Sequence, residues 1–102
     1  VCGGDEDNIA KALASEVGWN NDTANCAVGN NPSANNATGF SARPAGYYDG
    51  IYNSFGNYAY FWSATQITSY DAYLRYLDYN YADVSRYYYD KDDGYSVRCV
   101  RN

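Results

Sequence analysis

The residues of this chain that could do chemistry are aspartates, cysteines and an unusual number of tyrosines. The C-terminal third holds six aspartates: Asp71, Asp78, Asp83, Asp90, Asp92 and Asp93. General acid–base catalysis needs two positioned groups, but these carboxylates fall in expected strands and turns, where nothing pairs them. The sequence has no histidine, so a Ser-His or Cys-His nucleophile is absent. We therefore expect no enzyme activity and no cofactor.

Three cysteines, Cys2, Cys26 and Cys99, have a spacing that fits no zinc site. Their number favours one disulfide and one odd thiol. A Cys2–Cys26 bridge would close a loop of about 25 residues and stabilise the fold by about 3 kcal/mol in the chain-entropy model. It would also place the chain in an oxidising compartment. The alternative is that all three are buried thiols.

Tyrosine gives the chain its main means of recognition. Ten of the fourteen tyrosines lie between Tyr60 and Tyr95. Tyrosine offers a rigid amphipathic contact, and Asn, Ser, Gly and Asp add adaptable polar contacts, as in antibody binding loops. Tyrosine rings also stack on sugar rings and on other aromatic rings. The alternative is that many of them fill a core, because the chain has only three leucines, three isoleucines and no methionine.

Length and charge exclude several classes of protein. A chain of 102 residues is a single domain. Its net charge of −5 and pI of about 4.3 argue against nucleic-acid binding, which needs a basic surface. No apolar run reaches the ~20 residues of a membrane-spanning helix, so we expect no membrane insertion.

Strand-forming residues dominate the C-terminal half and must position the tyrosines. Alternating β-prone residues and an Asp-Gly hairpin signature predict a three-stranded antiparallel meander there. Its expected strands are Ala72–Tyr79, Val84–Asp90 and Tyr95–Val100, with turns at 80–83 and 91–94 and a further strand at Tyr58–Trp62.

The alternation of side chains along these strands divides the meander into two faces. Leu77 and Val84 should face the core, which would bury Arg75 and Arg86 beside them. The opposite face, together with two loop tyrosines, is predicted to form one ligand-binding surface. Its members are Tyr70, Leu74, Tyr76, Asp78, Tyr81, Ser85, Tyr87 and Tyr89.

The N-terminal part is predicted to be a short helix followed by a long loop. Apolar residues recur at helical spacing from Ile9 to Val17, and Gly18 suits the helix end. The acidic run at 5–7 suits a helix start; reading it as a fragment of a calcium loop is less favoured, because the glycine and distal glutamate of that loop are missing. Trp19 to Thr38 is rich in Asn, Ser, Gly and Pro and should be irregular.

Four segments occur in an order that identifies a family. They are GFSARPAGYY, FWSATQ, AYLRYLDYN and KDDGYSVRCVRN. Together they resemble the Fibrobacter succinogenes major paralogous domain, of the C-type-lectin-like and formylglycine-generating-enzyme-like fold group. The resemblance implies an α+β fold with one short N-terminal helix, long irregular loops and a twisted antiparallel sheet ending in the meander. It also implies a secreted or surface-attached bacterial protein.

The chain departs from this family at its start and at Cys99. Residues 1–102 resemble a single, partial C-type-lectin-like domain without the usual N-terminal half. In the family, the cysteine of the VRCV ending pairs with a cysteine of that half, so Cys99 is expected to lack its partner. A single cysteine also does not match the cysteine pair that holds copper in the formylglycine-generating relatives, so no metal site is expected.

These observations lead to two hypotheses about function. In the first, the chain is an extracellular or cell-surface binding module that recognises a glycan or a protein through its Tyr/Asp/Ser-rich sheet face. In the second, it is a structural subunit that assembles with copies of itself into a fibre or another oligomer. Its partners would be that ligand, its own N-terminal half joined through Cys99, or further copies.

Overall fold

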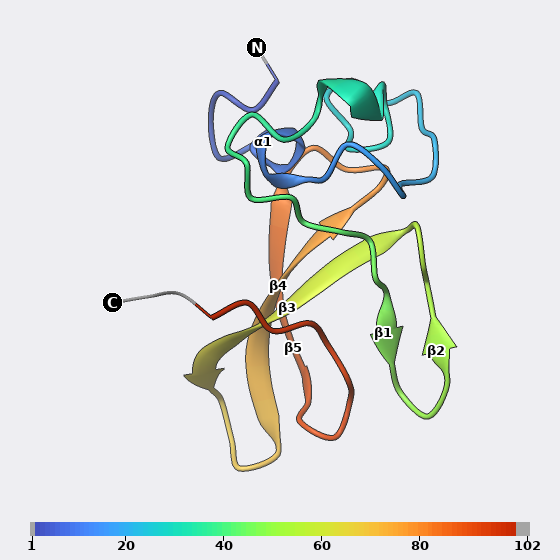
Figure 1. Cartoon of the computed structure of the whole chain (residues 1–102). Coiled ribbons are helices and arrows are strands. Elements are labelled where there is room, and N and C mark those ends of the chain that lie inside the picture. The colour runs from blue at the N-terminus through green and yellow to red at the C-terminus, as the bar shows by residue number, and fades with distance from the viewer. Residues whose placement is uncertain (1, 100–102) are drawn as a thin grey trace.

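The computed structural model describes residues 2–99 and shows an irregular half seated on one end of a β-sheet (Figure 1). We call residues 2–45 the loop half and residues 46–99 the sheet half. The loop half contains helix α1 (Ala10–Leu13) and one turn of 3-10 helix (Pro32–Ala34). The sheet half contains β1 (Tyr47–Tyr48), β2 (Tyr52–Asn53), β3 (Tyr58–Gln66), β4 (Asp71–Asp78) and β5 (Val84–Asp90). The fold is therefore small and mostly β.

The larger sheet is a three-stranded antiparallel meander in the order β3-β4-β5. The prediction of a meander is confirmed, but its first strand is β3, and the predicted third strand from Tyr95 is wrong. The segment from Tyr95 lies instead along the outer edge of β3, where the Trp62 N–H donates to the Ser96 carbonyl at 3.1 Å. Gly94 is held by Tyr48 of β1 instead, so the segment cannot also pair with β5. Val100 lies outside the described residues.

A second, two-stranded sheet is a hairpin that was not predicted from the sequence. Strands β1 and β2 pair through Tyr47↔Asn53 and Tyr48↔Tyr52, around a turn that contains Gly50. Gly46 precedes the hairpin with a φ of 68°, and a Cβ there would collide with the backbone carbonyl of Asn53. Only glycine fits this position without strain.

Helix α1 is shorter than predicted because the chain leaves it to pair with a loop. Ala14 is extended, forms a parallel bridge with Ala42, and is followed by Ser15, whose N–H donates to the Ala42 carbonyl at 2.9 Å. The expected helix to Val17 is therefore wrong. The expected irregular segment after Trp19 is confirmed, apart from its single 3-10 turn.

Small side chains and buried polar groups hold the loop half together. Its buried core is mainly alanine, with Val28 and Trp19. The Lys11 ammonium is buried and donates to the carbonyls of Asn30 and Asn31 and to Asn35 Oδ1, at 2.5, 3.2 and 2.7 Å. Burial lowers the pKa of Lys11.

A disulfide and a turn of the sheet complete the loop half. The predicted Cys2–Cys26 bridge is present, and Cys99 is an exposed free thiol. Three backbone N–H groups of the loop half, from Ala10, Val28 and Gly29, donate to carbonyls in the turn between β4 and β5. The loop half is thus attached to this turn by main-chain hydrogen bonds.

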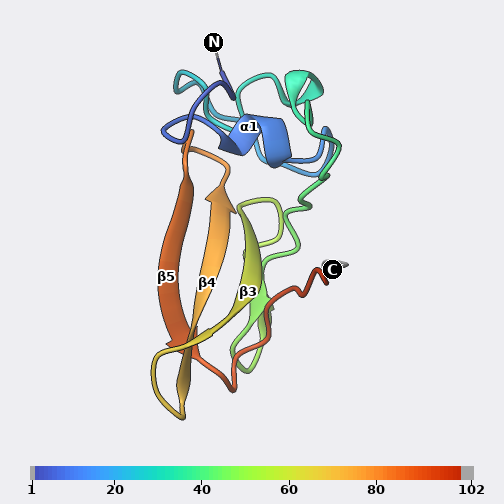
Figure 2. The same ribbon diagram turned by 90° about the vertical axis from the view of Figure 1, so that its left-hand side faces the viewer.

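The meander has two differently covered faces. Leu77 faces the core as predicted, since it is 3% exposed and packs with Val84 on the side of the loop half. The opposite face is not exposed as predicted, because Ala72, Leu74 and Asp78 of β4 are buried there. The predicted burial of Arg75 and Arg86 is wrong: both are exposed, because the loop half covers only the end of the sheet near Leu77. The hairpin lies on the other side of the sheet, which Figure 2 shows behind β3.

Candidate functional site

A network of aromatic rings occupies the sheet face that looks toward the hairpin. Neighbouring rings have centroids 4.9 to 6.2 Å apart, mostly in tilted or edge-to-face arrangements. Such geometry stabilises aromatic pairs beyond the area that they bury. We call this network the tyrosine cluster; it consists of Tyr47, Tyr58, Tyr60, Trp62, Tyr76, Tyr89 and Tyr95.

Five segments bring these rings together: β1, β3, β4, β5 and the segment after β5. Alternate residues of β3 place Tyr60 at the centre, where it is 6% exposed. The hairpin contributes Tyr47, whose ring meets Tyr60 edge-on at 5.3 Å. The segment after β5 contributes Tyr95, which stacks on Tyr47 at 5.7 Å and lies 5.1 Å from Tyr60. The cluster therefore joins the hairpin and the C-terminal segment to the sheet.

The central hydroxyls of the cluster are held in their neutral form. Burial raises the pKa of Tyr60 well above its ordinary value of 10.0, and the neighbouring Tyr89 adds to the rise. Burial also raises the pKa of Tyr95, with a further contribution from the Asp93 carboxylate. Neutral phenols can both donate and accept hydrogen bonds, which suits uncharged hydroxylated ligands.

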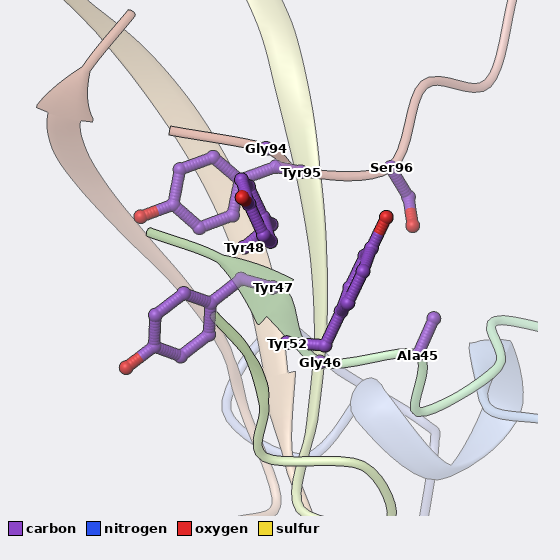
Figure 3. Close-up of a pocket in the computed structure, with 8 residues that line it drawn as sticks. All are labelled: Ala45, Gly46, Tyr47, Tyr48, Tyr52, Gly94, Tyr95 and Ser96. Atoms are coloured by element: carbon purple, nitrogen blue, oxygen red, sulfur yellow. The ribbon is translucent and has the colours of Figure 1, made fainter. Parts of the chain in front are cut away.

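An open groove lies between the hairpin and the C-terminal segment (Figure 3). Its volume is about 350 Å³, and no charged side chain lines it. In Figure 3 the ring of Tyr52 projects toward Ser96, whereas Tyr47 and Tyr95 point to the other side, toward the cluster. We call it the hairpin groove; it is lined by Ala45, Gly46, Tyr47, Tyr48, Tyr52, Gly94, Tyr95 and Ser96.

Two tyrosines make the exposed wall of the hairpin groove. Tyr48 and Tyr52 face each other across the hairpin, with ring centroids 4.7 Å apart. Tyr52 is 75% exposed, so one ring face is open to solvent. Gly94 packs against Tyr48, where an added Cβ would come within 3.0 Å of the Tyr48 Cβ. The two glycines of the groove thus allow the backbone to approach closely beneath the rings.

The predicted ligand-binding residues are only partly brought together. Four remain in contact along one face: Tyr76 and Tyr89 belong to the cluster, Tyr87 lies 5.4 Å from Tyr89, and Ser85 pairs with Tyr76. These four are the contiguous part of the predicted surface.

The other four predicted residues do not extend that surface. Leu74 is completely buried and Asp78 is 7% exposed, so the expectation that they are surface residues is wrong. Both were assigned to an exposed face, but rings of the cluster cover that face. Tyr70 and Tyr81 are exposed at opposite ends of β4 and do not join the rest.

The hairpin groove is not among the features predicted from the sequence, although a signal for it exists. Asp49-Gly50 lies between Tyr47-Tyr48 and Tyr52-Asn53. It is an Asp-Gly hairpin signature, like the one at residues 93–94 that predicts a turn there. Tyr60 also shares its strand phase with Tyr58 and Trp62, which would have placed these rings on one face. The contact with Tyr95 depends on tertiary structure and has no local signal.

The arrangement is suited to binding. Within residues 2–99, no three acidic or cysteine side chains lie close enough to hold a metal ion. None of the helices in that range has the length and apolar character to cross a membrane. The uncharged groove and its ring faces offer stacking surfaces and hydroxyl groups.

Comparison with known proteins gives one match. The sequence model of the Fibrobacter succinogenes major domain matches residues 5–101. No curated protein and no solved structure matches the chain.

Proposed function

The chain belongs to the Fibrobacter succinogenes major domain family, and from this premise we propose that it is an extracellular or cell-surface module that binds a neutral glycan in the hairpin groove. The observation that carries the proposal is the open, uncharged groove walled by Tyr48 and Tyr52. A tyrosine ring with an exposed face can stack on the apolar face of a sugar ring. The Cys2–Cys26 disulfide supports an oxidising location.

The chemistry of the groove favours a neutral sugar. The protein carries a net charge of −5, and none of the residues that line the groove is basic, so an anionic glycan would be repelled. The hydroxyls of Tyr52 and Ser96 can donate to sugar oxygens and accept from sugar hydroxyls. This role needs no catalytic group. We therefore propose that the chain is not an enzyme and that it is a C-type-lectin-like domain, as the resemblance described above implies.

A glycan array followed by titration of the best-retained sugar tests the proposal. Replacing Tyr52 by Ala should weaken binding by about 2 kcal/mol, the loss typical of a central aromatic contact. Tyr70→Ala is the matched control, because Tyr70 is equally exposed at 75% and lies in the turn between β3 and β4. Equal effects of the two variants, or no retained glycan, would contradict the assignment.

One observation favours self-assembly as a second function. Strand β5 forms an edge of the meander, and within residues 2–99 its outer side has no strand partner. Tyr87 and Tyr88 lie on this edge, 50% and 46% exposed, with parallel rings 5.0 Å apart. An open edge with exposed aromatic residues can pair with another copy.

Light scattering over a concentration series tests that second function. The mass should rise with concentration, and Tyr88→Lys, which adds a charge to the edge, should keep the protein monomeric. A wild-type protein that is monomeric throughout the series would contradict self-assembly and would leave glycan binding unaffected.

A further inference from the structure

The sheet has a second recognition face, on the side away from the hairpin. Figure 2 looks onto this side, where no second layer lies in front of the middle of β4 and β5. We call it the arginine face; its exposed or half-buried members are Phe61, Tyr73, Arg75, Arg86 and Tyr88. Apart from Tyr88, which also lies on the β5 edge considered for self-assembly, none of them was assigned a binding role above.

A mostly apolar groove lies where the arginine face meets the loop half. Its volume is about 350 Å³, near the lower end of the range for sites that bind small molecules. Arg75 and Arg98 are its only charged lining residues, and both are exposed. The remaining lining side chains are apolar: Ile9, Leu13, Phe40, Phe61, Leu77 and Val84.

The arginines of this face lack protein counter-ions. Arg75 and Arg86 are directly opposite on adjacent strands, a placement that is unfavourable for like charges. Across residues 2–99, no carboxylate lies within 4.0 Å of either guanidinium. This is notable in a chain of net charge −5, where acidic groups outnumber basic ones.

Two of the three guanidiniums on this side are engaged by aromatic rings. Arg86 lies 3.8 Å from the centroid of the Tyr73 ring. Arg98 lies 4.4 Å from that of Phe40, and its Nη1 donates to the Phe40 carbonyl at 2.9 Å. Arg75 has no comparable contact among the described residues. Arg75 is therefore the group at the groove with the greatest unused capacity to bind an anion.

We propose that this groove binds a small carboxylate with an apolar body, such as a medium-chain fatty acid. The apolar body would lie against Leu13, Phe61 and Val84, where its removal from water is favourable. The carboxylate would lie between Arg75 and Arg98, whose planar guanidiniums suit carboxylate geometry. The site is separate from the hairpin groove and does not depend on glycan binding.

Three probes of one shape test the proposal: octanoate, octanamide and octylamine, with head groups that are negative, neutral and positive. Each is titrated into the whole chain while methyl NMR signals of Leu13, Leu77 and Val84 are followed. Octanoate should shift these signals to saturation, with an affinity roughly tenfold or more above that of octanamide, as expected for a charge-assisted contact. Octylamine should bind least. Equal binding of octanoate and octanamide, or shifts confined to the hairpin groove, would overturn the proposal.

Matched variants separate the charge of the groove from its shape. Arg75→Gln should weaken octanoate binding roughly tenfold, whereas Arg43→Gln, which removes the same charge from an exposed position outside the groove, should not. Ile9→Trp should fill the groove and abolish binding without changing any charge. If an acidic leucine-containing peptide binds and octanoate does not, the small-ligand assignment is wrong. Glycan binding at the hairpin groove should be unchanged in all three variants.

Discussion

The loop half and the sheet half are stabilised by different kinds of side-chain packing. Both must fold with very few aliphatic side chains, since the whole chain has three leucines and three isoleucines. The loop half packs alanines around a buried Lys11 that makes three hydrogen bonds, and adds a disulfide. The sheet half surrounds Tyr60 with other aromatic rings.

Because of this difference, alkaline pH should change the stability of the two halves in opposite directions. In the sheet half, burial raises the pKa of four tyrosines of the cluster. Their stabilising contribution is complete below pH 10.0, the ordinary tyrosine value, and is lost as pH rises toward the folded-state values. In the loop half, burial lowers the pKa of Lys11, so its contribution grows as pH rises toward its ordinary 10.5.

The largest expected effect is therefore unfolding of the sheet half above pH 10, because several tyrosines of the cluster lose their stabilising contribution together. The two tryptophans make it measurable, since Trp19 lies in the loop half and Trp62 in the sheet half. Trp19→Phe leaves Trp62 as the fluorescent reporter, and Trp62→Phe leaves Trp19. The Trp62 signal should change at lower pH than the Trp19 signal.

A pair of tyrosine variants checks that this effect comes from the cluster. Tyr60→Phe keeps the ring but removes a buried titrating hydroxyl, so the alkaline midpoint should rise. Tyr70→Phe, at an exposed turn position, should leave it unchanged. A common midpoint for both tryptophans, unaffected by Tyr60→Phe, would contradict the comparison.

Removing the disulfide should have the next largest effect. The double variant Cys2→Ser, Cys26→Ser should lower the free energy of unfolding by about 3 kcal/mol, the loop-closure value for this separation. In urea, the Trp19 transition should move to lower denaturant more than the Trp62 transition. Equal shifts would show that the two halves unfold as one cooperative unit.

Gly46 tests how strongly the sheet half depends on the hairpin. Gly46→Ala should cost about 2 kcal/mol more than Gly39→Ala, because it adds a backbone collision to the strain of a positive φ. Gly39 is the matched control, with a φ of 77° and open space around it. Thermal melting of both variants measures the difference, and equal losses would mean that the hairpin relaxes freely.

Replacing Asp78 should have the smallest effect on stability, and it should stabilise the protein rather than destabilise it. Burial raises its pKa, so the ionised carboxylate weakens the fold at neutral pH. Asp78→Asn should stabilise the protein by less than about 1 kcal/mol at pH 7. The gain should disappear below pH 3.8, the ordinary aspartate value, where the folded carboxyl is neutral as well. The exposed Asp7→Asn, which removes the same charge away from Asp78, serves as control and should leave the stability at pH 7 nearly unchanged.

Local pattern was enough to predict strands β4 and β5 and the disulfide, but not the hairpin strands β1 and β2. Strand β5 was predicted with its observed bounds, and β4 within one residue at each end. Alternation also placed Leu77 in the core correctly, although the opposite face at Leu74 is buried as well. The Cys2–Cys26 pairing followed from the spacing of the cysteines around the N-terminal segment.

Local sequence pattern does not show which faces of the sheet are covered, because that depends on tertiary contacts. Leu74 was placed on an exposed face because alternation separates two faces but does not say whether both are covered. Alternation predicts a buried Arg75 because it shares a face with Leu77, but the loop half covers only the end of that face near Leu77. Half of the predicted ligand-binding residues stay contiguous, and the hairpin groove was missed because it forms only when Gly94 and Ser96 return to the hairpin.

The hydrogen bonds between the loop half and the turn after β4 also imply an order of events during folding. Consecutive strands of the meander are close in sequence, so they can pair after closing only short loops. The acceptors for Ala10, Val28 and Gly29 exist in the right geometry only once that turn has formed. The N-terminal residues, although made first by the ribosome, would therefore acquire their structure last, with residues 79–82 as the template.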